Sequence, residues 1–507
     1  MSNPLKKLAG QTVIYGLGTI IPRLLNYMLT PLLTVGVNGF LPAEYGINSE
    51  LYAYISFLNV IFTYGMETAF FNYNSKLEDK EKVYNNAFAA LLASTLFFSI
   101  VLMLFTPAIA DSLSTPNAVY RTRFILWSVL IIATDTICAM PFARLRAQNK
   151  ALKFSLLKLI NVVVNFSVTF FLVRICRNAH LAGDNSFVAF IYNPETGIGY
   201  VFLANLIANL VTMALLSKEL ITVKLKPDKV LMKEMLTYAW PLLILGLAGM
   251  VNETLDRIIL KKLMVNKVEA QVAQGIYGAC YKIAILMTVF IQAFRFAAEP
   301  FFFNRAKEKD SKKTYAVVMK YFIIFCLLLF LATTLNLGWI KYFVGSAYWE
   351  GLTVVPTLLL ANLFLGVMYN LSIWYKLSGQ TKFGAIIALS GAAITVIINW
   401  IFVPTYSYVA CAWATFAAYG GMMVLSYILG QKYFPIKYNL KAILVYTGVA
   451  LLFYLVSFSY QHLGSTLIKL LLNNLLILLF VWIVYKLEFN NLKKLSSNVA
   501  AADQSNK

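Results

Sequence analysis

Hydrophobic and polar positions are distributed along the chain in long blocks rather than alternating residue by residue. Apolar runs of about 20 residues are separated by short polar loops, and about 20 helical residues cross the ~30 Å hydrocarbon core of a bilayer. The pattern therefore predicts fourteen membrane-spanning helices. They cover about residues 12–36, 48–72, 86–109, 122–142, 152–174, 199–217, 234–257, 273–300, 315–337, 352–375, 383–403, 406–429, 440–459 and 465–486.

Composition agrees with this pattern. Of the 507 residues, 60% are hydrophobic and 13% are charged, which is typical of a polytopic all-α membrane protein and not of a soluble domain. We expect no cleavable signal peptide, because the first apolar run is long and lacks a small-residue cleavage site.

The basic residues predict how the chain is oriented. An even number of spans places both termini on one side of the membrane. Loops on that side hold 28 Lys and Arg residues, against 9 in the loops on the other side. Loops rich in Lys and Arg face the cytoplasm, so we expect both termini there. The net charge of +21 is thus explained by topology, and we expect no nucleic-acid partner.

A short motif occurs twice and predicts a duplicated architecture. Tyr45-Gly46 precedes Glu67 as Tyr277-Gly278 precedes Glu299, and a Phe-Phe-Asn triplet follows each glutamate, always at an offset of 232 residues. We expect two six-helix lobes in parallel orientation, with two further helices. The predicted divisions are residues 1–217, a cytoplasmic linker 218–233, residues 234–430, spans 13 and 14 within 431–486, and a cytoplasmic tail 487–507.

Several kinds of chemistry are not expected. Two histidines and five scattered cysteines without a C-x-x-C pair favour neither a metal site nor a disulfide framework. The chain has neither a G-x-x-x-x-G-K-[ST] phosphate loop nor a G-x-S-x-G elbow. We therefore expect no cofactor and no enzymatic activity.

Charged residues within the spans are the candidates for function, because a charge facing lipid is costly. Arg23 lies near the middle of span 1, between Pro22 and Pro31, which interrupt that helix. We assign Arg23 and Asn26 to a substrate cavity. The alternative is that Arg23 forms a structural ion pair with Glu67 or another carboxylate.

Span 7 ends with a charged cluster formed by Asn252, Glu253, Asp256 and Arg257. Glu253, Asp256 and Arg257 are expected to share a helix face, on which Glu253 and Arg257 can pair at i,i+4. One hypothesis is a self-neutralising cluster near the outer surface. The other is a cavity lining that includes a proton-carrying carboxylate.

Span 8 carries Lys282, Arg295 and Glu299. Lys282 and Arg295 are 13 residues apart, or roughly 220° around an ideal helix, so they can face one cavity only if the helix is kinked or rotates between states. Lys282 has no local partner and is the better ligand candidate, whereas Arg295 can pair with Glu299. Glu67 and Glu299 occupy equivalent span ends, which predicts either a cytoplasmic gate or simple pairing with basic loop residues.

Two further predictions concern structural roles. Asp135 and Lys158 lie at similar depths in adjacent spans and are expected to form a buried pair. Lys320 lies near a span end, where its long side chain is expected to reach the interface.

Three stretches resemble those of the Wzx-type polysaccharide flippases of the multidrug/oligosaccharidyl-lipid/polysaccharide exporter superfamily. They are YGLGTIIPRLLNYMLTPLLT at 15–34, YAWPLLILGLAGMVNETLDR at 238–257 and QAFRFAAEPFFFNRA at 292–306, and the resemblance extends over all fourteen spans. It implies two lobes around a central cavity lined by spans 1, 2, 7 and 8, and alternating access in the bacterial cytoplasmic membrane.

The resemblance also implies a cargo of undecaprenyl-diphosphate-linked oligosaccharide and a cationic cavity. The matching cations are Arg23, Arg257, Lys282 and Arg295, while Glu67, Glu253, Asp256 and Glu299 leave room for coupling to H⁺ or Na⁺. Membrane lipids and other polysaccharide-assembly proteins are the expected partners. Independently, a diphosphate requires basic groups and a sugar head requires a wet cavity.

Two alternatives are considered. A drug or cation antiporter of the same superfamily would need acidic residues to dominate the cavity. A membrane glycan polymerase or ligase would normally have a large external loop with catalytic basic residues, and the longest external connection here, about residues 175–198, is short.

Overall fold

The computed structural model describes residues 20–225, 227–306, 310–460 and 462–505. Within these ranges the chain is helical and has no strand; an isolated bridge joins Thr115 to Ala118. The predicted all-α class is thereby confirmed.

The described helices begin with α2 (Leu29–Thr34), α3 (Pro42–Thr63), α4 (Met66–Lys76), α5 (Lys80–Leu104), α6 (Thr106–Leu113), α7 (Thr122–Ala147), α8 (Ala151–Phe170), the π-helix η1 (Phe171–Cys176), α9 (Arg177–Leu181), α10 (Phe187–Ile191), the 3₁₀-helix η2 (Gly197–Gly199), α11 (Tyr200–Leu215) and α12 (Ser217–Ile221). They continue with α13 (Lys229–Leu263), α14 (Lys267–Arg305), α15 (Ser311–Leu335), α16 (Leu337–Ile340), the 3₁₀-helices η3 (Lys341–Phe343) and η4 (Ser346–Val354), α17 (Val355–Leu371), α18 (Ile373–Leu377), α19 (Lys382–Tyr433), α20 (Leu440–Ser459) and α21 (Thr466–Ser505).

Eleven helices of the described chain are long and apolar enough to cross a membrane. One of them is α19, whose 52 residues cover two predicted spans and are interrupted at Ser407 (φ 52°, ψ −139°). The predicted span 48–72 is also divided, into α3 and α4, by positive φ angles at Tyr64 and Gly65. The chain is a multi-pass membrane protein, and the number fourteen stays a prediction.

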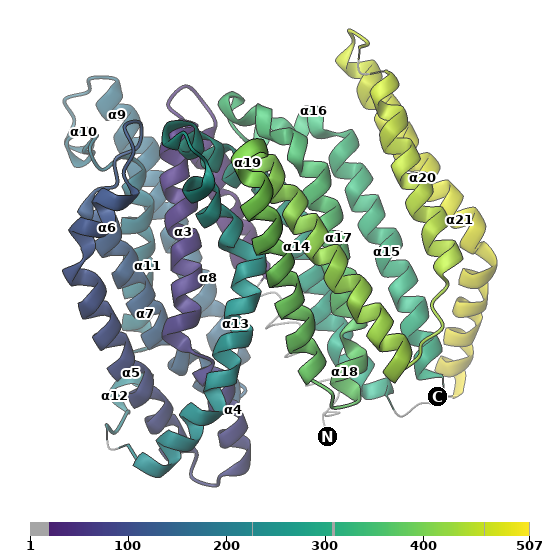
Figure 1. Ribbon diagram of the computed structural model, residues 1–507, viewed down its shortest axis with the longest axis horizontal. Helices are drawn as coiled ribbons and strands as arrows, with labels where there is room; N and C mark the ends of the chain where they lie inside the picture. The colour runs from purple at the N-terminus through teal and green to yellow at the C-terminus, as the bar shows by residue number, and fades with distance from the viewer. Residues whose placement is uncertain (1–19, 226, 307–309, 461, 506–507) are drawn as a thin grey trace.

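The helices form two neighbouring groups with α13 between them (Figure 1). In the first group, α3, α5, α7, α8 and α11 pack together, and in the second, α14, α15, α17 and α19 do so. Helix α13 packs against both α3 and α19, while α20 and α21 pack on α15 at the edge of the second group. The division into two repeated lobes stays a prediction.

Two ends of the molecule are distinguished below. Helices α4, α12 and α18 lie at one end, called the α4 end, and α6, α9, α10 and α16 lie at the opposite end, called the α6 end (Figure 1). The loops at the α4 end are those whose basic residues predict a cytoplasmic location.

Helices α3 and α14 approach each other closely at glycines. A Cβ atom on Gly275 would lie 1.8 Å from the carbonyl oxygen of Pro42, and one on Gly278 would lie 2.2 Å from Ser49 Oγ. Gly46 faces α14 in the same way, at 2.6 Å from the carbonyl oxygen of Gln271. Both copies of the repeated Tyr-Gly pair therefore contribute a glycine to one helix contact, which joins the two groups nearer the α6 end.

The prediction that the Lys320 side chain reaches the interface is wrong. This side chain is buried, with Nζ 2.5 Å from Glu488 Oε2 on α21. The hydroxyls of Tyr321 and Tyr446 donate to the same carboxylate, at 3.0 and 2.7 Å. Sequence spacing could not reveal this pair because its members are 168 residues apart.

Candidate functional site

A central cavity lies between the two groups of helices and has about 1740 Å³ of empty space, part of it open to solvent. Its wall is formed by residues 23–33, by α3, α13 and α14, and by a few positions on α8, α11, α17 and α19. The predicted lining helices are thus present, together with helices that the sequence did not indicate.

Three cations line the cavity in the described part of the chain: Arg23, Arg257 and Lys282. Arg23 is exposed, and neither Arg23 nor Lys282 has a hydrogen bond or ion pair among the described residues. Glu253 is the one lining carboxylate that the described residues supply, and it interacts electrostatically with Arg23 across the cavity. The described lining therefore has a cationic excess.

Arg257 is held in place by an ion pair and two neutral groups. Its Nη1 lies 4.0 Å from Asp256 Oδ1. Its guanidinium lies over the ring of Tyr281, 4.1 Å from the ring centroid, and Nη1 donates to the backbone carbonyl of Glu253 at 3.0 Å. The predicted pairing of Arg257 with the Glu253 side chain is therefore wrong: the arginine contacts the carbonyl of that residue, and the carboxylate stays free to face the cavity.

Asp256 and Asn252 do not line the cavity, although Asp256 stays close to Arg257 as the sequence predicts. Asp256 is 3% exposed and accepts a 2.6 Å hydrogen bond from the hydroxyl of Tyr277. Asn252 is buried and joins α13 to α19, donating to the carbonyl of Ala388 at 3.1 Å and accepting from Thr395 at 3.2 Å. Both residues position α13.

Neutral polar side chains complete the lining. Asn26 is the one that the sequence analysis assigned to the cavity, and the others were not identified from the sequence. Asn48, Tyr52 and Ser56 recur every fourth residue and form a polar stripe on α3. Asn205 donates to the Tyr52 hydroxyl at 2.8 Å. Other lining residues of this kind are Tyr45, Ser49, Asn165, Thr288, Gln292, Asn362, Tyr369 and Tyr419. The spacing of Asn48, Tyr52 and Ser56 is the signal that could have revealed this face.

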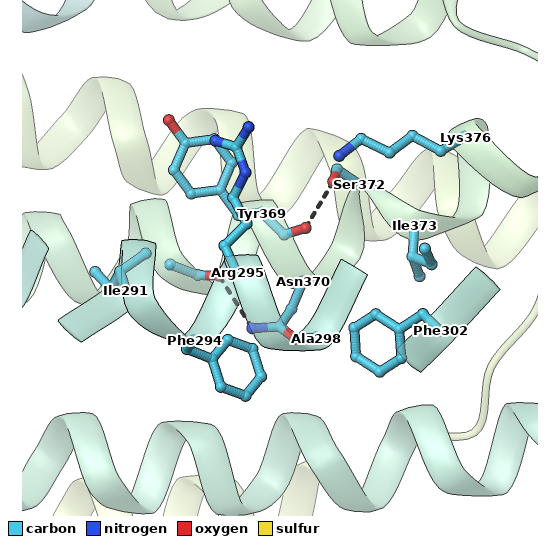
Figure 2. A pocket seen from close by; sticks show the side chains of 11 residues that line it. Ile291, Phe294, Arg295, Ala298, Phe302, Tyr369, Asn370, Ser372, Ile373 and Lys376 are labelled. Carbon is cyan, nitrogen blue, oxygen red and sulfur yellow. Dashed lines mark hydrogen bonds between the residues drawn. The ribbon is translucent and has the colours of Figure 1, made fainter. Parts of the chain in front are cut away.

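Arg295 lies outside the central cavity. It borders a neighbouring pocket with about 300 Å³ of empty space, and its guanidinium lies over Tyr369 at 4.8 Å from the ring centroid (Figure 2). Lys282 and Arg295 thus face different spaces, as their spacing predicts. Asn370 and Ser372 hydrogen-bond to backbone carbonyls of α17 in this pocket (Figure 2).

Glu67 forms an ion pair with Arg146 at the start of α4, away from Arg23. The alternative that Arg23 pairs with Glu67 is therefore wrong, and Glu67 fits the hypothesis of pairing with basic loop residues. The side chain of Glu299 lies outside the described residues, so its predicted pairing and the symmetric gate stay predictions.

A second polar cavity lies within the first group of helices and includes Glu67, Asp135 and Lys158. Asp135 accepts a 3.0 Å hydrogen bond from Asn209, while Lys158 lies over the ring of Phe142, 4.2 Å from its centroid. Asp135 and Lys158 interact electrostatically within this cavity, in line with the predicted buried pair, but no direct ion pair joins them in the described chain.

The fold defines the class of protein. The chain resembles a structure described as the lipid II flippase MurJ in an inward closed conformation, with 16% identity and a TM-score of 0.66, over 94% of this chain and 99% of that one. It also resembles inward- and outward-facing MATE family multidrug transporters of the MOP superfamily, with 14% and 13% identity and TM-scores of 0.60 and 0.57. These matches cover 83% and 85% of this chain and 94% and 96% of the others.

This is the polytopic fold of flippases and multidrug transporters. The family model for polysaccharide biosynthesis proteins matches residues 8–305, and the chain belongs to that family. Comparison with curated protein sequences gives no significant match.

Proposed function

We propose that this protein is a flippase that moves undecaprenyl-diphosphate-linked oligosaccharide from the inner to the outer leaflet of the bacterial cytoplasmic membrane. The cargo moves by alternating access of the central cavity and serves cell-surface polysaccharide biosynthesis. Both termini face the cytoplasm. Membership of the polysaccharide biosynthesis family and the flippase-type fold support the proposal.

The observation that carries the proposal is the cationic cavity between the two helix groups. A diphosphate leaving water loses its hydration, and charge-assisted hydrogen bonds are the strongest replacement available. Arg23 and Lys282 make no hydrogen bond or ion pair in the described chain, and they face the same space. They are therefore available to a diphosphate.

The neutral lining suits the sugar part of the cargo. Amide and hydroxyl groups both donate and accept hydrogen bonds, as sugar hydroxyls do. The stripe of Asn48, Tyr52 and Ser56 presents such groups along one wall, and Asn165, Asn205 and Gln292 present others. The polyprenyl chain stays in the surrounding lipid.

Glu253 is the position at which we propose that transport couples to H⁺ or Na⁺, because it is the described carboxylate that faces the cavity. Proteins that build and export the polysaccharide are the proposed partners. No resident cofactor is needed, because flipping breaks no covalent bond.

The test is flipping of a defined lipid-linked oligosaccharide by the purified protein in liposomes, with undecaprenyl phosphate lacking sugar as a second substrate. We expect flipping of the glycolipid, and an approximately tenfold loss in Lys282→Gln, since one charge-assisted contact is removed. The matched control is Lys341→Gln, because Lys341 lies over Trp349 and does not line the cavity.

Export of an organic cation without glycolipid flipping would contradict the proposal and favour the drug antiporter. An unchanged flipping rate in Lys282→Gln would contradict the role of this lysine.

A further inference from the structure

A second hollow, called the slot here, lies against a different face of α3 from the central cavity. It has about 1370 Å³ of empty space between α3, α5, α6 and α7. Most of its wall is apolar, formed by Leu51, Ile55, Leu58, Leu102, Ile109, Leu113, Ile125, Val129 and Ile132. Nothing in the proposed flipping mechanism uses this space.

The periodicity of α3 separates the two spaces. Asn48, Tyr52 and Ser56 face the central cavity, whereas Leu51, Ile55 and Leu58 face the slot. At 100° per residue these two sets are centred roughly 90° apart, so they lie on different faces of the helix. One face of α3 is therefore suited to a polar head group and the other to a hydrocarbon chain.

One part of the slot wall is cationic. Lys261, Lys262 and Lys267, from the end of α13 and the start of α14, line it together with one carboxylate, Glu50. Glu50 is already neutralised, since Lys261 Nζ lies 3.0 Å from its Oε2 and the Tyr120 hydroxyl donates to the same oxygen. The charge left over belongs to Lys262 and Lys267.

These two lysines differ in how they are held. Lys267 donates to the carbonyls of Lys261, Lys262 and Met264 at 3.0, 2.9 and 2.9 Å, which fixes its position. Lys262 is exposed and, within the described ranges, makes neither a hydrogen bond nor an ion pair. The hydroxyls of Ser112, Ser114 and Thr115 line the slot as well.

We propose that the slot binds an anionic phospholipid, with one acyl chain among the apolar residues and the phosphate on Lys262, beside the positive charge of Lys267. An apolar cavity beside an uncompensated cationic cluster is complementary to one molecule that carries both a chain and a negative charge. Phosphatidylcholine carries the chain but has no net charge, and inorganic phosphate carries the charge without the chain. Neither satisfies both parts of the site.

The site is tested by native mass spectrometry of the detergent-purified protein with added dioleoylphosphatidylglycerol. We expect one phosphatidylglycerol to be retained at energies that remove phosphatidylcholine. Lys262→Gln should weaken its binding about five- to tenfold, as expected for one charge-assisted contact. Lys341→Gln, which removes a lysine outside the slot, should leave the binding unchanged.

A matched tryptophan pair separates the slot from the outer surface of the protein. Leu102 lines the slot, whereas Leu104 on the same helix is 74% exposed and does not line it. Leu102→Trp should abolish the retained lipid by filling the slot, and Leu104→Trp should not.

Three results would overturn the proposal: equal retention of phosphatidylcholine, equal loss in both tryptophan variants, or displacement of the lipid by millimolar inorganic phosphate. Glycolipid flipping is not measured in any of these experiments, so their outcome is independent of the proposed transport function.

Discussion

Two charged regions lie close to α3 and differ in how their charges are satisfied. In the central cavity, Arg23 and Lys282 make no hydrogen bond or ion pair within the described chain. In the Glu50 cluster, formed by Glu50, Tyr120, Lys261 and Gln271, Glu50 and Lys261 are 1% and 6% exposed. Every member of this cluster has a hydrogen-bond partner within it, since Gln271 donates to the Tyr120 hydroxyl at 3.2 Å.

The difference shows which charges serve the scaffold. A charge buried away from water is costly unless it is paired and hydrogen-bonded, so the cluster can exist only as a complete network. This network joins α3 to α13 and α14 beside their glycine contact. The cavity cations remain in a polar space that a ligand can enter, so they can stay unpaired.

The largest effect is expected in the cluster. Lys261→Met removes the cation and leaves Glu50 buried without its charge partner, which should destabilise the protein by about 3–5 kcal/mol. Thermal unfolding in detergent measures the loss. Adding Glu50→Gln should restore much of it, because no buried charge is then left unpaired. If Lys261→Met were as stable as the wild type, the Glu50 cluster would not be a structural network and would not differ from the cavity in this respect.

In the cavity, loss of function without loss of stability is expected. Arg23→Ala should reduce glycolipid flipping at least about a hundredfold, because a guanidinium can contact a diphosphate through two hydrogen bonds, while the unfolding temperature stays unchanged. Arg23→Lys should recover part of the rate, since lysine keeps the charge but loses the forked geometry. Flipping and unfolding are measured on the same preparations.

The double mutant Arg23→Ala/Glu67→Ala tests whether Arg23 has a structural role. Glu67 pairs with Arg146, so its removal should not restore flipping. Recovery in the double mutant would show that Arg23 is scaffold and would contradict its assignment to the substrate.

A smaller loss of stability is expected where α3 meets α14. In Gly275→Ala the new methyl group would lie 1.8 Å from a backbone oxygen, so the helices must separate, at about 1–3 kcal/mol. Gly249→Ala on α13 is the matched control, because no atom lies within 4 Å of its Cβ position. If both variants unfold at the same temperature, the close contact does not hold the two groups together.

The smallest effect is expected at an exposed pair. Asp228 caps α13 and lies 2.7 Å from Lys82, whose hydrogen bond lowers the pKa of this carboxyl group. A lowered pKa in the folded state stabilises the protein at neutral pH, and this contribution is lost as the pH falls from about 4 through the folded pKa. Asp228→Asn should barely change the unfolding temperature at pH 7. If Asp228→Asn lowered the unfolding temperature as much as Lys261→Met, the exposed and the buried ion pair would contribute equally to stability, against this prediction.

Long apolar runs, interrupted by basic loops, determined the class of the protein from the sequence alone, because the bilayer imposes a length and a hydrophobicity on every crossing. Local spacing also separated Lys282 from Arg295, since a helix fixes directions 13 residues apart. The partners of buried charges could not be predicted from local spacing. The ion-paired residues Glu50 and Lys261 are 211 positions apart, and Lys320 and Glu488 are 168 apart. Glu67 forms its ion pair with Arg146 and not with Arg23.

Which side of a helix faces a cavity also depended on the neighbouring helices. The sequence placed Glu253, Asp256 and Arg257 together. Asp256 does lie beside Arg257, but it packs against Tyr277 in the interior, and only the other two line the cavity. The polar stripe of α3 faces a cavity only because α13, α14 and other helices form the rest of its wall. Secondary structure follows from local patterns, whereas the partner of a buried charge is decided by contacts between distant segments, and only the tertiary structure contains those.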